Sequence, residues 1–195
     1  MNKTIYTLGI CNDETSSACL FINGSLISAV SEERFSRKKY DNSFPNKSIN
    51  YLLKENSIKL SRIDNISYAW SKGLEPKLKK KYDKRFLYLK KKDSKEFKIF
   101  SQRYKFDVLG DKKNRNEFKK WASTSLTKKQ LNNVKIFYHH HAHAANASLL
   151  SPFNKGLVLT ADGRGDFESL TISIFNRSKI NPLKKIYSTT SSDSL

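Results

Sequence analysis

The dipeptide Asn23-Gly24 lies between two short apolar segments, 18–22 and 26–31, and is a strong short-range signal for a two-residue β-hairpin. A further apolar segment, 4–10, comes before them and is separated from them by a polar turn. Three such segments in a row predict that the chain opens as an antiparallel meander of three strands.

The rest of the chain mixes helical and strand patterns. A helix is predicted to begin at Pro45, because Ile49, Leu52 and Leu53 recur at the spacing of one helix face. Further along we expect strands at 63–70, 134–138, 156–161 and 170–175, a helix at 142–150 and a tight glycine turn at 162–166. The expected fold class is therefore α/β.

Two parts of the sequence resemble each other. The strand–turn–strand pattern of residues 5–22 returns at 157–175. Hydroxyls follow the turn in both, at Ser16 and Ser17 and at Ser169 and Thr171. Duplicated hairpins followed by mixed α/β structure indicate the two-lobed actin-like or sugar-kinase (ribonuclease H-like) architecture. In that architecture the two turns face each other and hold nucleotide phosphates through backbone N–H groups and hydroxyls.

This architecture predicts how the chain is divided. We expect the first actin-like lobe at residues 1–155, with a basic helical insertion at 72–133. Residues 156–195 are expected to be the beginning of a second, truncated lobe.

The net charge of +19 is concentrated in the insertion, where residues 72–129 hold 21 Lys/Arg and 7 Asp/Glu. Thr127 and Gln130 have the spacing of a helix capping box near its end. We favour a solvated helical surface, and docking of an anionic partner such as nucleic acid is the alternative. The aromatic residues recur at spacings that suit buried helix faces rather than stacking on bases: Tyr82, Phe86, Tyr88, Phe97, Phe100, Tyr104 and Phe106.

The sequence indicates a cytoplasmic protein without a membrane segment. The apolar run 5–10 is too short for a signal peptide, and no stretch is long enough to span a bilayer. The two cysteines, Cys11 and Cys19, lack CxxC spacing and are expected to be buried, reduced structural thiols.

All four histidines of the chain lie within residues 139–143. His139 and His143 are four residues apart, so on a helix both rings project from one face and can share a metal ion. Asp162 is the expected carboxylate ligand, because it ends a strand that should run beside the strand ending at Tyr138. Of His140 and His141, one is expected to orient a ligand and the other to be solvated. Surface or structural histidines are the alternative.

The segment Asp162-Gly163-Arg164-Gly165-Asp166 places two glycines between two carboxylates. Glycine permits positive φ and a close approach of the backbone to a phosphate. We therefore predict that Gly163, Gly165 and Asp166 contact a phosphate, with a plain hairpin turn as the alternative.

Three cations follow the third predicted strand, at Arg34, Arg37 and Lys39. They could clamp an acyl phosphate or a nucleotide phosphate, for which the arginine guanidinium is the better geometric fit. Because the charges of this segment alternate in sign, a solvated helix face explains them equally well.

These motifs together resemble the nodulation and antibiotic O-carbamoyltransferases. Residues 29–45 (AVSEERFSRKKYDNSFP) are similar to the signature that follows the opening hairpin in that family. Residues 139–145 and 162–165 match its next two motifs in order and spacing, and 151–153 also fit. The resemblance extends over residues 5–175, interrupted by the basic insertion.

The resemblance implies an activity. Such enzymes transfer a carbamoyl group from carbamoyl phosphate to a hydroxyl of a sugar or natural product. ATP first gives carbamoyl-adenylate in a C-terminal YrdC-like domain. An actin-like domain, similar to the universal tRNA threonylcarbamoylation protein, then transfers the group with the help of a divalent metal, typically Fe²⁺. The implied metal ligands here are His139, His143 and Asp162, and the implied catalytic contact comes from the first turn, at Asp13 and Glu14.

This sequence also departs from the family pattern. Glu14-Thr15 stands where the family has His-Asp, and neither the fourth metal ligand nor the YrdC-like domain has a counterpart before Leu195. We therefore expect an N-terminal fragment, or one half of a split gene, that is inactive without a polypeptide carrying the remainder. The alternatives are a non-catalytic module that binds metal and an anion such as tRNA, and an inactive remnant.

Overall fold

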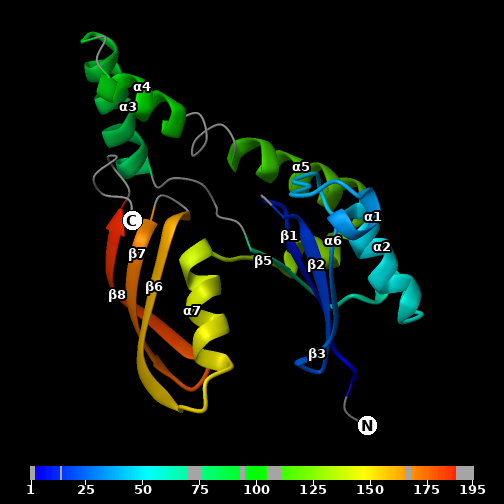
Figure 1. Cartoon of the computed structure of the whole chain (residues 1–195). Helices are drawn as coiled ribbons and strands as arrows, with labels where there is room; N and C mark the ends of the chain where they lie inside the picture. The colour runs from blue at the N-terminus through cyan, green and yellow to red at the C-terminus, as the bar shows by residue number, and fades with distance from the viewer. Residues whose placement is uncertain are drawn as a thin grey trace. The chain divides into compact units, whose positions relative to one another are not determined.

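The computed structural model describes residues 3–13, 15–69, 76–92, 95–104, 111–165 and 168–187. The chain divides into two compact units, the first made of Met1–Trp70 with Lys113–Phe137 and the second of Ser71–Lys112 with Tyr138–Leu195 (Figure 1). The boundary between these units differs from the boundary of the expected lobes, which are residues 1–155 and 156–195. The division into lobes stays a prediction.

The first unit is built on a mixed five-stranded sheet with the order β3-β2-β1-β4-β5. The opening strands β1, β2 and β3 pair antiparallel, as predicted, and Asn23 and Gly24 form their connecting turn with φ of 52° and 83°. The strand β4 pairs parallel to β1, and β5 pairs parallel to β4. The bounds are β1 Tyr6–Cys11, β2 Ser17–Ile22, β3 Ser25–Ser31, β4 Asn65–Tyr68 and β5 Val134–Ile136.

Helices cover one face of this sheet. The predicted apolar face of α2 (Asn46–Glu55) is buried through Ile49, Leu52 and Leu53, which join Leu8 and other strand residues in one core. Complete burial of one such side chain stabilises the fold by about 1.5–3 kcal/mol, so the helix spacing in the sequence decides which side of α2 faces inward. The remaining helices of the unit are α1 (Glu33–Ser36), the 3-10 helix η1 (Leu60–Arg62), α5 (Asp111–Ser125) and α6 (Lys128–Asn132).

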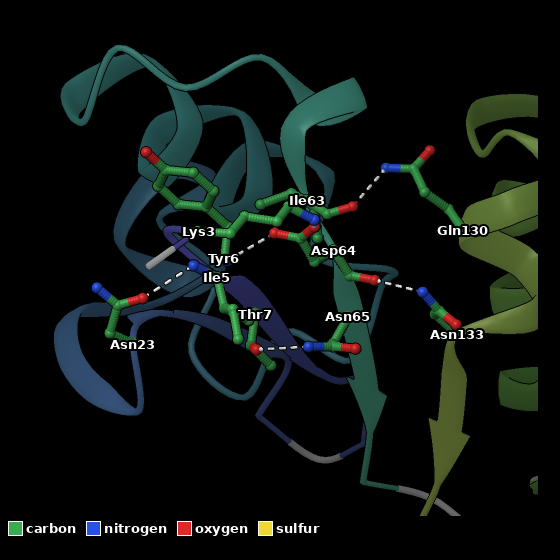
Figure 2. A network of polar contacts seen from close by, with 10 residues as sticks. All are labelled: Lys3, Ile5, Tyr6, Thr7, Asn23, Ile63, Asp64, Asn65, Gln130 and Asn133. Atoms are coloured by element: carbon green, nitrogen blue, oxygen red, sulfur yellow. Dashed lines mark hydrogen bonds and ion pairs between the residues drawn. The ribbon is translucent and has the colours of Figure 1, made fainter. Parts of the chain in front are cut away.

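A network of polar contacts connects the end of the insertion to the first sheet, as Figure 2 shows. The Gln130 amide donates to the carbonyl oxygen of Ile63 at 3.0 Å, and the Asn133 amide donates to that of Asp64 at 3.0 Å. The Asp64 carboxylate in turn accepts from the backbone N–H of Tyr6 at 3.0 Å. These bonds join the end of α6 to the two residues just before β4 and to the first residue of β1, and so set where β5 enters the sheet.

The described part of the insertion is helical, as predicted, with α3 at Pro76–Lys90 and α4 at Lys95–Tyr104 ahead of α5 and α6. Thr127 and Gln130 form the predicted capping box. Tyr88 is exposed, so its expected burial was wrong, and Phe106 lies outside the described residues. The other predicted aromatic residues pack between α3 and α4: Tyr82, Phe86, Phe97, Phe100 and Tyr104.

The second unit contains an antiparallel sheet of β6 (Lys155–Gly165), β7 (Glu168–Asn176) and β8 (Lys179–Tyr187) in that order. The helix α7 (His139–Leu149) lies against one face of this sheet (Figure 1), where Ala144, Val158 and Phe175 form the core. The β6–β7 hairpin was predicted from the sequence, whereas β8 was not. No helix in the described residues is both long and apolar enough to cross a membrane.

Two expectations about this region were wrong. Asp162–Gly165 continue β6 instead of forming a tight turn, because Gly165 still pairs with Glu168 beyond an irregularity in the register. In addition, β6 does not run beside β5, since the two strands belong to different sheets. What brings Asp162 to the histidines is the packing of α7 on β6.

The other face of the β6–β8 sheet carries several exposed apolar side chains, together with Asn181 and Lys184 on β8. Leu157 pairs with Ile174, and Leu159 lies two residues further along the same side of β6. We call these side chains the exposed apolar face: Leu157, Leu159, Ile174, Leu183 and Ile186.

Candidate metal centre

The three predicted metal ligands lie together in the second unit. His139 is the first residue of α7 and His143 lies one turn later, so both rings project from one side of the helix. The Nε2 atom of His139 is 2.8 Å from Oδ2 of Asp162 and 2.8 Å from Nε2 of His143, and the latter is 3.4 Å from Oδ2 of Asp162. The side chains therefore converge on one point, although that they bind a metal stays a prediction.

The spacing of the three donor atoms fits a bound cation. Ligand bonds of about 2.1 Å at angles between about 90° and 109° place neighbouring donor atoms about 3.0–3.4 Å apart. The three atoms are 2.8–3.4 Å apart, so one ion could contact all of them with little movement of the side chains. Two imidazoles and a carboxylate suit Fe²⁺, Mn²⁺ or Zn²⁺ and leave further positions for water or substrate.

The surroundings of Asp162 keep its carboxyl group ionised. Partial burial raises the pKa of this carboxyl, but the hydrogen bond with His139 and the charges of the neighbouring imidazoles lower it by more. The net pKa lies below its ordinary value. The carboxylate, which is the form that binds a metal, therefore persists to lower pH than in an exposed aspartate.

The structure separates the two central histidines, whose roles the sequence left open. His140 is buried, with its ring nitrogens within hydrogen-bond distance of the Thr160 hydroxyl and the backbone carbonyl of Glu168. His141 is partly exposed on the same helix. His140 is therefore the histidine of the core, and a role in orienting a ligand stays a prediction. Thr160 was not singled out from the sequence, since a threonine in an apolar strand carries no local sign of a distant histidine.

Gly165 allows His139 to reach the site. A β-carbon on residue 165 would overlap the His139 ring, whereas one on Gly163 would meet nothing. Neither glycine has positive φ, so the conformational reason expected for them is not found. What is special about Gly165 is the close approach of an imidazole to its backbone. A phosphate contact from Gly163 or Gly165 stays a prediction, and Asp166 lies outside the described residues.

The first turn belongs to the other unit. Asp13 lies in the turn between β1 and β2 and is partly buried, while Glu14 lies outside the described residues. The N–H of Ser16 donates to the carbonyl of Asp41 at 2.9 Å, and the N–H of Glu32 donates to the carbonyl of Ser16 at 2.8 Å. The turn is thereby joined to the basic segment that follows β3.

The three predicted phosphate clamps, Arg34, Arg37 and Lys39, are all exposed on that segment. Glu32 just before them is buried, and its carboxylate accepts from the N–H and hydroxyl of Ser48, both at 2.8 Å, at the N-terminus of α2. The segment is therefore not a uniformly solvated helix face, because one of its charges caps a helix from within the core. Nζ of Lys39 lies 5.2 Å from the ring centroid of Tyr40, and the phosphate-binding role of the three cations stays a prediction.

The two cysteines are free and partly buried in the first sheet, in agreement with the expected thiols. Gly9 on β1 makes room for one of them, since a β-carbon at Gly9 would lie 2.5 Å from Sγ of Cys19. Burial raises the pKa of Cys11 to about 11 and also raises that of Cys19.

Comparison with known protein families tests the resemblance seen in the motifs. A family model described as "Carbamoyltransferase N-terminus" matches residues 7–190, which is nearly the whole chain. The chain belongs to this family. The resemblance inferred from the motifs is thereby confirmed.

Curated relatives of this carbamoyltransferase N-terminus are much longer than the chain. Nodulation protein NolNO of Sinorhizobium fredii is 29% identical over 167 residues, a match that covers 86% of this chain and 22% of that protein. An uncharacterized protein of Synechocystis, sll1178, is 29% identical over 182 residues, with 88% and 27% covered. The chain thus spans about a quarter of the length of these relatives.

Among solved structures, YeaZ from Pseudomonas aeruginosa is similar with a TM-score of 0.50 and 12% sequence identity, over 92% of this chain and 64% of that chain. At this identity the likeness concerns the fold alone. It agrees with the actin-like fold class expected from the duplicated hairpins, with a mixed sheet followed by an antiparallel one.

Proposed function

We propose that this carbamoyltransferase N-terminus takes part in the ATP-dependent transfer of a carbamoyl group, and that His139, His143 and Asp162 hold the divalent ion used in that reaction. The observation that carries the proposal is the convergence of three ligand atoms within 4.8 Å of one another in a chain of this family. When bound, such an ion, of which Fe²⁺ is our first choice, supplies Lewis-acid stabilisation to a phosphate leaving group.

The substrates follow from the family resemblance. Carbamoyl phosphate, ATP and water give carbamoyl-adenylate with release of phosphate and pyrophosphate. The carbamoyl group then passes to a hydroxyl of a sugar or natural product, and AMP leaves. Arg34, Arg37 and Lys39 would neutralise phosphate charge, a role that their exposure leaves open to them. The first turn, at Asp13 and Glu14, and the phosphate contacts of Gly163, Gly165 and Asp166 complete the proposed set.

Adenylate formation and the rest of the second lobe would come from a further polypeptide segment, on the same or another chain. This segment would correspond to the part of the relatives that this chain does not cover. The exposed apolar face of the β6–β8 sheet supports this, because contiguous apolar patches on a surface mark sites of interaction. Its occupant would be an apolar face of that polypeptide.

Metal analysis tests the centre. After dialysis against Mn²⁺, or against Fe²⁺ without oxygen, the wild type should retain one ion per chain. His139→Ala, His143→Ala and Asp162→Asn should each weaken binding at least about tenfold, since each removes a ligand. The matched control is His141→Ala, which removes a histidine of the same helix that lies outside the group and should bind as the wild type does. Equal binding by all four variants would contradict the proposed centre.

Carbamoyl transfer is tested separately. The chain is mixed with a polypeptide equivalent to the remainder of a family member and given labelled carbamoyl phosphate, ATP and a sugar acceptor. Label should enter the acceptor with the wild type and not with His139→Ala, and the chain by itself should show no turnover. Robust turnover by the isolated chain would contradict the proposed division of labour.

A second candidate function rests on the α3–α4 pair, where residues 76–104 hold 12 Lys/Arg and 3 Asp/Glu. Tyr88 is exposed there, with Nζ of Lys92 4.7 Å from its ring centroid. Such a surface suits a non-catalytic module that binds an anion such as tRNA. RNA retention that falls steeply with salt and is unaffected by metal removal would favour it.

A further inference from the structure

His140 is held by hydrogen bonds from two strands while the residues around it form the metal centre. Its Nδ1 atom is 2.7 Å from the hydroxyl oxygen of Thr160 on β6, and its Nε2 atom is 2.8 Å from the carbonyl oxygen of Glu168 at the beginning of β7. The Thr160 hydroxyl is in turn 2.6 Å from that of Thr171. All four of these residues are buried.

The chemistry of these partners fixes the tautomer of His140 when its ring is neutral. A carbonyl oxygen only accepts, so Nε2 of His140 carries a hydrogen and donates to Glu168. In the neutral imidazole, Nδ1 then accepts from the Thr160 hydroxyl, which in turn accepts from Thr171. The network is therefore fully satisfied with one direction of donation and one tautomer.

The network joins the two elements that carry the ligands. His140 is adjacent to His139 on α7, and Thr160 is two residues before Asp162 on β6, so both pairs are linked by stiff backbone. Glu168, whose carbonyl accepts from His140, is itself held in place, because its carboxylate pairs with Nζ of Lys185 on β8 at 2.5 Å. A shift of α7 along or around its axis that separated His139 from Asp162 would therefore also have to break the bonds of His140.

From these contacts we infer that His140, together with Thr160, is a positioning residue that sets the distance between the α7 ligands and Asp162. The inference rests on the proposed metal centre. The competing explanation is a core histidine whose bonds serve stability alone. The two explanations differ in the expected metal affinity of a variant that lacks the network. A positioning role predicts a loss of affinity beyond that of an equally destabilised variant, and a purely stabilising role does not.

Thr160→Val cuts the network, because valine has the shape of threonine without the hydroxyl. Thr160→Ser restores the hydroxyl and serves as the rescue. The matched control is Val158→Ala, which removes buried volume from the same strand and the same α7 interface without touching a hydrogen bond. For each full-length variant, Mn²⁺ affinity is measured by calorimetry, and resistance to urea is measured on the metal-free chain.

Thr160→Val should bind Mn²⁺ about 10–100-fold more weakly than the wild type, the usual effect of removing a residue that orients metal ligands. Thr160→Ser should stay within about threefold of the wild type, and so should Val158→Ala even if it unfolds at lower urea concentration. Two results would overturn the inference: unchanged affinity in Thr160→Val, or an equal loss in Val158→Ala. If the wild type binds no Mn²⁺ and no Fe²⁺, the proposed metal centre fails together with this inference.

Discussion

The ring of His139 lies against the backbone of Gly165, at the place where any side chain on residue 165 would begin. Gly165→Ala should therefore push the ring away from Asp162 and weaken metal binding at least about tenfold. Gly163→Ala is the matched control, since it lies on the same strand with open space around it and should leave the affinity unchanged. Calorimetric titration with Mn²⁺ measures both.

Equal metal affinities for Gly165→Ala and Gly163→Ala would show that the His139 ring can move aside without cost. The close approach at Gly165 would then have no part in the centre.

Tyr68 should contribute to stability through its hydroxyl. Its side chain is fully buried, and the hydroxyl donates to Oδ1 of Asn12 at 2.5 Å, while the ring stacks on Phe118 with centroids 4.1 Å apart. Tyr68→Phe keeps the stacking and leaves the buried amide oxygen of Asn12 without this donor. We expect a loss of about 1–3 kcal/mol in the free energy of unfolding, measured in urea.

The exposed Tyr51 provides the control for that measurement, since Tyr51→Phe should change the free energy of unfolding by less than about 0.5 kcal/mol. An equally small effect at Tyr68 would mean that the buried hydroxyl contributes nothing.

Asp41 should make stability depend on pH in acid. Hydrogen bonds from the Ser36 hydroxyl and from the N–H and hydroxyl of Ser43 lower the pKa of Asp41 from 3.8 to about 2. A carboxyl group with a lowered pKa stabilises the folded state at any pH above its ordinary pKa. This contribution disappears as the pH falls from about 4 toward about 2. Asp41→Asn should thus be less stable than the wild type at pH 7, with a difference that shrinks below about pH 4. Urea unfolding across pH 3–7 checks this, and a constant difference would contradict it.

Cys11 should react slowly with alkylating agents. Burial, with smaller effects from the charges of Asp13 and Cys19, raises the pKa of its thiol from 9.0 to about 11. At pH 8 the reactive thiolate is then about 100-fold rarer than in the unfolded chain. Iodoacetamide labelling followed by mass spectrometry, with and without urea, measures the ratio. Similar labelling rates in both conditions would count against the raised pKa.

Several features could be predicted from short stretches of sequence, because each depends on neighbours along the chain. Asn23-Gly24 specifies its hairpin by turn chemistry, Thr127 and Gln130 specify a helix start, and the inward face of α2 follows from the spacing of Ile49 and its partners. The two candidate histidine ligands were found in the same way, since His139 and His143 need only a helix to share a face, whereas Asp162 was predicted from a strand adjacency that the structure does not have.

The amino-acid sequence alone thus determined the fold class, the opening meander and the identity of the three candidate ligands. Only the tertiary structure decided how they meet: Asp162 reaches the histidines because α7 packs on β6, although β5 and β6 lie in different sheets. It also decided that His140 is the buried histidine and that Gly165 makes room for His139. These outcomes depend on contacts between separate segments of the chain, such as His139 with Asp162, 23 positions apart, and such contacts leave no periodic trace in either segment.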